Sequence, residues 1–84
     1  MAQTHKIDIN SMKFNPASLT ITKGDTVEWT NSMPMDHTAT ADGGAFNSGH
    51  IKSGKSFSHT FQSSGPFKYH CEIHTNMTGT VTVS

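Results

Sequence analysis

The chain has 84 residues, a single cysteine, and six lysines that balance six acidic residues, so its formal net charge is zero. This length predicts one domain, residues 1–84, with a small hydrophobic core, and the lone cysteine excludes an internal disulfide and the multi-cysteine frameworks of zinc and iron–sulfur sites. The lack of arginine and of any basic cluster argues against a nucleic-acid partner, and no apolar run approaches the ~20 residues that cross a bilayer.

Short runs in which apolar and polar residues alternate predict a series of β-strands. In chain order, the residues that share the apolar face of each run are Ile7 and Ile9; Leu19 and Ile21; Val27 and Trp29; Phe57, His59 and Phe61; Phe67, Tyr69 and Cys71; Val81 and Val83. Turn signals at 23–25 and 63–66 separate some of these runs, and the stretch 41–56, rich in Gly, Ser and Asp, predicts a loop with at most one short strand. The twelve threonines and ten serines also favour β structure. We therefore expect an all-β sandwich of two sheets with almost no helix.

The end of the chain carries three sulfur and nitrogen donors at regular spacing. Cys71 is followed three residues later by His74 and three residues after that by Met77. One more imidazole would complete two nitrogens and one thiolate with a weak axial thioether, which is the donor set of a blue-copper electron-transfer site. Each residue alone has a simpler interpretation, because free cysteine and methionine are common core residues. The regular spacing of Cys71, His74 and Met77 favours a metal site over three unrelated core residues.

His37 is the best candidate for the remaining imidazole, because it enters a predicted strand from a loop that can lie beside the metal loop. We expect His5 to be solvated, His50 to be exposed, and His59 to be partly buried and hydrogen-bonded. His70 neighbours Cys71, but strand alternation directs its side chain to the opposite face. An apolar collar beside the metal is expected from a small set of neighbours, namely Met33, Pro34, Met35 and Ile73.

Several motifs resemble those of cupredoxins, and the metal loop resembles that of amicyanins and plastocyanins. The matching stretches, which cover nearly the whole chain, are 14–17, 19–21, 23–31, 37–40, 46–49, 57–61, 65–71 and 77–83. The resemblance implies a Greek-key sandwich that binds one type 1 copper through His37, Cys71, His74 and Met77. It also implies that His74 reaches the surface within an apolar patch where redox partner proteins dock. The mature form of such a protein is expected to be periplasmic or otherwise extracytoplasmic. No signal peptide is expected in this chain. Many relatives carry prolines in the loop where this chain has Ile73, Thr75 and Asn76.

These observations predict a small, monomeric electron carrier that cycles one copper between Cu(II) and Cu(I), and not an enzyme. Backbone amides should donate to the Cys71 sulfur, and Asn31 or Thr38 should fix the His37 ring. A copper carrier or scavenger would use the same ligands. A less favoured alternative is a copper-enzyme subunit in which His70 helps to bind a further copper at an interface. A sandwich without metal would leave the spaced donors unexplained.

Overall fold

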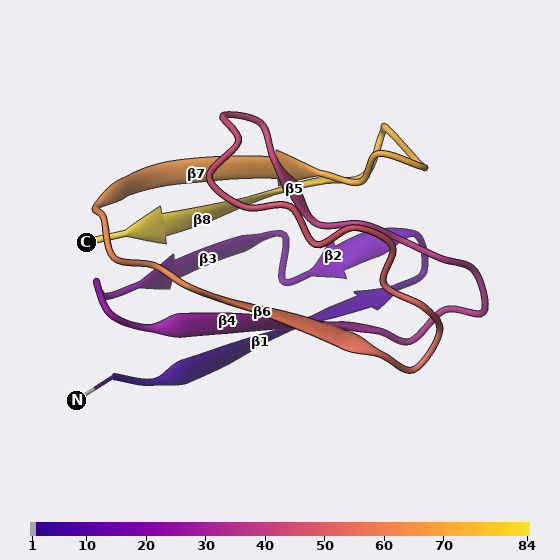
Figure 1. Ribbon diagram of the computed structural model, residues 1–84, viewed down its shortest axis with the longest axis horizontal. Helices are drawn as coiled ribbons and strands as arrows, with labels where there is room; N and C mark the ends of the chain where they lie inside the picture. The colour runs from indigo at the N-terminus through magenta and orange to yellow at the C-terminus, as the bar shows by residue number, and fades with distance from the viewer. Residues whose placement is uncertain (1) are drawn as a thin grey trace.

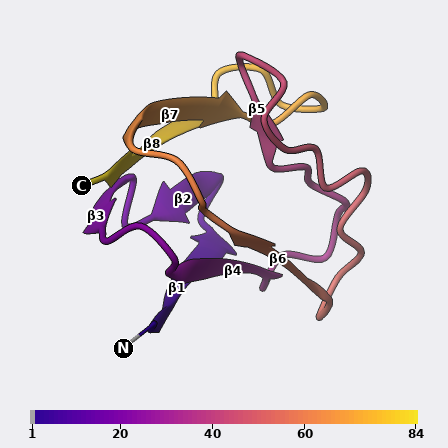
Figure 2. The same cartoon turned by 60° about the vertical axis from the view of Figure 1, so that its left-hand side comes forward.

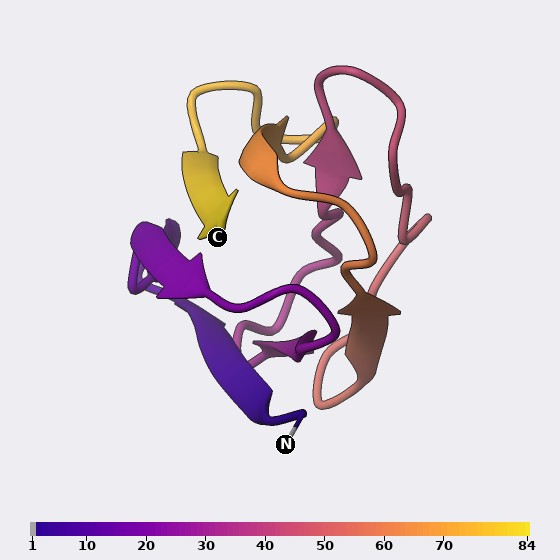
Figure 3. The same ribbon diagram turned by 90° about the vertical axis from the view of Figure 1, so that its left-hand side faces the viewer.

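The computed structural model describes residues 2–84, which form two four-stranded β-sheets that face each other (Figures 1 and 3). The strands are β1 (Thr4–Asn10), β2 (Lys13–Asn15), β3 (Ser18–Ile21), β4 (Thr26–Asn31), β5 (Thr40–Ala41), β6 (Ser56–Thr60), β7 (Gly65–His70) and β8 (Thr78–Val83). One sheet has the order β2-β1-β4-β6 and the other β3-β8-β7-β5. No helix occurs within residues 2–84, so the predicted all-β, two-sheet sandwich is confirmed.

The connections cross repeatedly between the two sheets. From β3 to β7, each strand lies in the opposite sheet from the one before it. As a result β1 pairs in parallel with β4, and β3 pairs in parallel with β8, while the remaining neighbours are antiparallel. This long-range connectivity is typical of a Greek-key sandwich. No helix among the described residues is long and apolar enough to span a membrane.

The core follows the predicted alternation of the strands. Trp29 on β4 is fully buried, and its ring centroid lies 5.4 Å from that of Tyr69 on the opposite sheet. Some core residues were not predicted, among them Phe14 and Phe46. Phe14 comes from the three-residue strand β2, and Phe46 comes from the irregular stretch that joins the sheets along one side (Figures 2 and 3). Phe46 packs 5.2 Å from Trp29 between ring centroids, so this loop closes the side of the sandwich.

The two ends of the sandwich differ in character. The chain termini lie at one end, and the loops 31–37 and 71–77 lie at the other (Figure 1). At the terminal end the buried carboxylate of Asp25 accepts hydrogen bonds from the Gln3 and Thr22 amides at 2.9 and 3.1 Å and contacts His5 Nε2 at 2.9 Å. The expectation that His5 is solvated was therefore wrong, because a buried carboxylate that needs donors holds its ring.

Candidate metal centre

The loop 71–77 joins β7 to β8 and is closed at its base by backbone hydrogen bonds. The Cys71 amide donates to the Met77 carbonyl at 3.0 Å, and the Met77 amide donates to the His74 carbonyl at 2.9 Å. Cys71 continues the inward parity of Tyr69 and is fully buried. These bonds fix both ends of the loop, so the Cys71 side chain points inward just where the strand ends.

The backbone around His37 is held by pairing with Ile51 and by the Asn31 side chain. The His37 backbone exchanges two hydrogen bonds with Ile51, at 3.2 and 2.7 Å. The fully buried Asn31 side chain donates to the carbonyls of Met35 at 2.7 Å and Ile51 at 2.8 Å, and accepts from the Met33 amide at 2.9 Å. Asn31 therefore fixes the backbone around His37 and not its ring, which corrects one of the two predicted roles. Ile51 was missed, and the only signal was a single β-branched residue in a polar loop.

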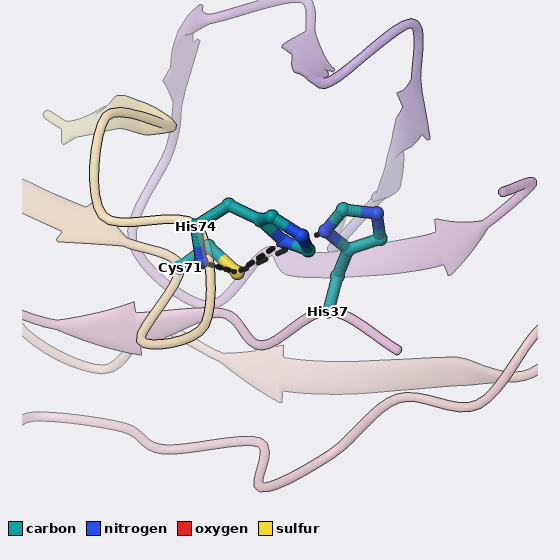
Figure 4. Close-up of side chains that lie close together, drawn as sticks. All are labelled: His37, Cys71 and His74. Carbon is teal, nitrogen blue, oxygen red and sulfur yellow. Dashed lines mark hydrogen bonds between the residues drawn. The ribbon is translucent and has the colours of Figure 1, made fainter. Parts of the chain in front are cut away.

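His37, Cys71 and His74 converge on one small volume. One nitrogen or sulfur atom from each lies within 4.8 Å of the other two. The Cys71 Sγ is 3.8 Å from His37 Nδ1 and 3.9 Å from His74 Nδ1, and both rings are turned toward the sulfur (Figure 4). Within residues 2–84 this is the one group of three such side chains close enough to share a metal ion.

The Cys71 sulfur also receives two backbone amides. The amides of Thr38 and His74 each lie 3.4 Å from Sγ, which confirms the prediction that amides donate to this sulfur. Thr38 has a second role, because its buried hydroxyl accepts a hydrogen bond from the Glu72 amide at 2.8 Å. Thr38 thus joins the His37 segment to the Cys71 loop. It does not contact Nε2 of the His37 ring, so the prediction that it fixes this ring was also wrong.

The electrostatics of this group suit a soft metal ion. Burial, and secondly the nearness of His74, hold the pKa of His37 below its ordinary value, so the neutral ring with a free lone pair is favoured. The His37 Nε2 is buried without a partner among the described residues. Two imidazole nitrogens and one sulfur that also receives two backbone amides form a set that selects copper over magnesium, calcium or manganese. The residues present therefore fit a copper ion.

Met77 and the remaining histidines occupy separate positions. Met77 lies at the end of the same loop and is 2% exposed. His70 points to the outer face as predicted and contacts Asp42 at 2.6 Å, and His50 is exposed, also as predicted. His59 is partly buried as expected. Its ring packs 5.1 Å from Phe46 and 4.7 Å from Phe61, but within residues 2–84 it has no hydrogen bond, so that part of the prediction was wrong.

Comparisons with known proteins agree with this geometry. The sequence pattern of the copper binding proteins of the plastocyanin/azurin family matches residues 1–84. The chain is 34% identical over 82 residues to amicyanin from Paracoccus denitrificans, which covers 92% of the chain but spans only 63% of that relative. It is 33% identical over 89 residues to plastocyanin from Scenedesmus fuscus, with 90% of the chain and 91% of the relative covered. Among solved structures, the copper(I) form of an amicyanin point mutant superposes with a TM-score of 0.92 at 30% identity, over 96% of this chain and 82% of that chain. The chain therefore belongs to the plastocyanin/azurin family of copper-binding proteins, the cupredoxins.

Proposed function

We propose that this protein is a small electron carrier that cycles one type 1 copper between Cu(II) and Cu(I). The observation that carries the proposal is the convergence of one donor atom each from His37, Cys71 and His74 within 4.8 Å of one another. Bound copper would supply the one-electron chemistry, and the chain supplies a cage that is already assembled. Because hydrogen bonds fix both ligand-bearing segments, the donors need to move little between oxidation states, which favours fast electron exchange.

We propose His37, Cys71, His74 and Met77 as the ligands of this copper. The first three are supported by their mutual distances. Met77 is supported by its burial and by the hydrogen bonds that join its backbone to Cys71 and His74. In this assignment the Cys71 thiolate would be the strong ligand, the two imidazoles would supply the nitrogen donors, and the Met77 thioether would be the weak donor that tunes the potential.

Electrons would enter and leave through His74, which is the only partly exposed member of the three-residue group. Two exposed apolar residues belong to the loops at this end of the sandwich (Figure 1), Ile73 at 42% in the loop of His74 and Met35 at 40% in the loop before His37. With a formal net charge of zero, long-range steering is weak. We propose that redox partner proteins dock on this apolar surface and that the protein itself is a monomer, which sedimentation of the copper-loaded form would test.

We also propose that residues 1–84 act as one copper-binding domain, because the buried apolar residues of the described chain form one continuous cluster. An extracytoplasmic location of the mature form, which the family resemblance implies, completes the proposal. Fractionation of the source cells is the test of location. Recovery of the protein with the cytoplasmic fraction would contradict it.

Two other functions share part of this geometry. A copper carrier would use the same ligands, and the measurable difference is kinetic: fast electron self-exchange favours the electron carrier, and rapid transfer of copper to an acceptor favours the other role. A copper enzyme would need a further metal near His70. Within residues 2–84 that ring meets only the Asp42 carboxylate, and no second group of three donors is present.

Titration with cupric ion tests the proposed function. One equivalent should bind and give an intense visible band, because charge transfer requires a thiolate bound to copper. Cys71→Ser should abolish the band. His70→Gln is the matched control, since His70 adjoins Cys71 but leaves on the other face of β7, and this variant should keep the band. A parent protein that stays colourless, or a serine variant that stays blue, would refute the assignment.

A further inference from the structure

Two exposed side chains with donor atoms that suit soft metal ions, Met35 and His50, stand on the two segments that hold the His37 backbone. Met35 is 40% exposed, and the His50 side chain is 62% exposed. Neither is among the ligands proposed above. A thioether and an imidazole are both good ligands for monovalent copper, so their neighbourhood is of interest in a copper-binding protein.

The fold brings these two residues together from distant parts of the sequence. Asn31 Nδ2 donates to the carbonyls of Met35 and Ile51 at 2.7 and 2.8 Å, so the segments before His37 and around Ile51 are held side by side. Asp36, which follows Met35, places its carboxylate 3.0 Å from His50 Nδ1. Met35 and His50 therefore stand on adjoining segments that hydrogen bonds hold together, and the carboxylate of Asp36, the residue next to Met35, contacts the His50 ring.

The Asp36 contact also prepares the His50 ring for a metal. Donation from Nδ1–H to the carboxylate leaves the lone pair of the neutral ring on Nε2, and this carboxylate–histidine arrangement is the usual outer support of a metal-binding imidazole. The other charged group at this place is Lys52, whose Nζ lies 3.4 Å from the same Asp36 oxygen. The lysine contacts the carboxylate and not the imidazole, so Nε2 stays available.

Two of the three converging donors cannot make the first contact with an arriving ion. His37 and Cys71 are both 0% exposed, and only His74 is partly exposed, so surface donors on the His37 side would give an ion a second point of entry. Met35 is two residues from His37, and His50 directly precedes Ile51, the residue that pairs with His37. Soft donors on both segments that hold a buried ligand form a short path from the surface to that ligand.

We propose that Met35 and His50 form an exterior site that captures monovalent copper and passes it to the buried centre. The proposal rests on the copper function argued above. The transfer is an exchange of ligands at one ion: the bonds to Met35 and His50 break, bonds to the inner donors form, the Cys71 thiol releases its proton to solvent, and copper stays in the +1 state throughout.

Silver(I), a redox-inert analogue of copper(I), tests the exterior site directly. In Cys71→Ser protein, where the inner thiolate is missing, a silver titration should shift the NMR signals of the Met35 methyl group and the His50 ring. Met12 is the matched internal control, because it is 37% exposed in the β1–β2 turn of the same protein. Replacing both residues, Met35→Leu with His50→Gln, should weaken silver binding by about tenfold or more, by analogy with the effect of losing supports at metal sites.

The second arm measures the rate at which copper(I), supplied as a chromophoric chelate, loads the protein with Cys71 intact. The double variant should load about tenfold more slowly and still reach one copper per chain, whereas Met12→Leu with His70→Gln should load like the parent. Equal rates in all three proteins, equal slowing in both variants, or silver shifts at Met12 instead of Met35 would overturn the proposal. If the parent protein gave no visible band in the cupric titration described above, that result would refute the electron-carrier function instead. The silver titration would still report on Met35 and His50.

Discussion

Gly79 is a position where a single methyl group should destabilise the fold strongly. It lies opposite Tyr69 in the β7–β8 register, and a Cβ atom at Gly79 would fall 2.4 Å from both Cζ and Oη of the Tyr69 ring. That ring is fully buried, with ring centroids 4.7 Å from Phe14 and 5.4 Å from Trp29. Because Phe14 and Trp29 on the opposite sheet confine the ring, it has little room to move away from the new methyl group.

The expected cost follows from the depth of this overlap. Adding a methyl group to a well-packed core costs about 1–3 kcal/mol. We expect Gly79→Ala to reach the upper value, about 3 kcal/mol, because the clash is with a rigid ring and not with a flexible side chain. For a domain of this size each kcal/mol lowers Tm by about 4–8 °C. The Tm of metal-free Gly79→Ala should therefore be about 10–25 °C below that of the metal-free parent.

Gly43→Ala is the matched control, because a Cβ atom there would meet nothing within 4 Å. Its stability should lie within about 0.5 kcal/mol of the parent. Tyr69 stands two residues before Cys71, and Gly79 stands two residues after Met77. A shifted ring should therefore also move the visible band of the copper-loaded protein. Equal stability of the two alanine variants would refute the claim that Tyr69 is held rigidly.

Three further predictions concern single side chains. Hydrogen bonds, first from His5 and then from the Gln3 and Thr22 amides, lower the pKa of Asp25 from 3.8 to about 2, so the stabilisation is present above pH 3.8 and is lost as the pH falls toward 2. Urea midpoints across that interval should fall in the parent and change less in Asp25→Asn; parallel curves would contradict this. Burial raises the pKa of Tyr69, the only tyrosine, from 10.0 to about 12 despite an opposing contact from Trp29, so phenolate absorbance should appear only near pH 12 and stability should decline between those values as the pH rises. A titration midpoint near 10.0 in folded protein would be the contrary result. Thr38→Val removes the acceptor of the Glu72 amide, which should cost about 1 kcal/mol and speed hydrogen exchange of that amide; unchanged exchange would show that the bond does not hold the loop.

Much of the fold and the centre was accessible from local sequence pattern. Strand alternation predicts which side of the sheet a residue faces, and it correctly placed Trp29 and Tyr69 in the core and His70 outside it. The same parity, continued by one step, directs Cys71 inward at the start of the metal loop. These predictions succeed because a side chain's face in a strand depends only on its neighbours along the chain.

The features that were missed depend on contacts between distant segments. Phe46 is a single aromatic residue in a loop, and no periodicity reveals that it packs on Trp29. The Asn31 side chain bonds to the carbonyl of Ile51, twenty residues away, which only the Greek-key crossings bring near it. His5 and Asp25 are twenty residues apart, and their contact follows from the parallel pairing of β1 with β4. Side-chain partners of this kind are set by topology and not by local pattern.

A crystal structure of the copper-loaded protein, with anomalous scattering recorded at the copper edge, tests the central claim most directly. The account predicts one copper peak bonded to Cys71 Sγ and flanked by the Nδ1 atoms of His37 and His74. These side chains should stay close to the positions they hold without metal, because hydrogen bonds already fix the segments that carry them. A copper peak with no bond to Cys71, or a loop 71–77 that must refold to reach the ion, would contradict the account.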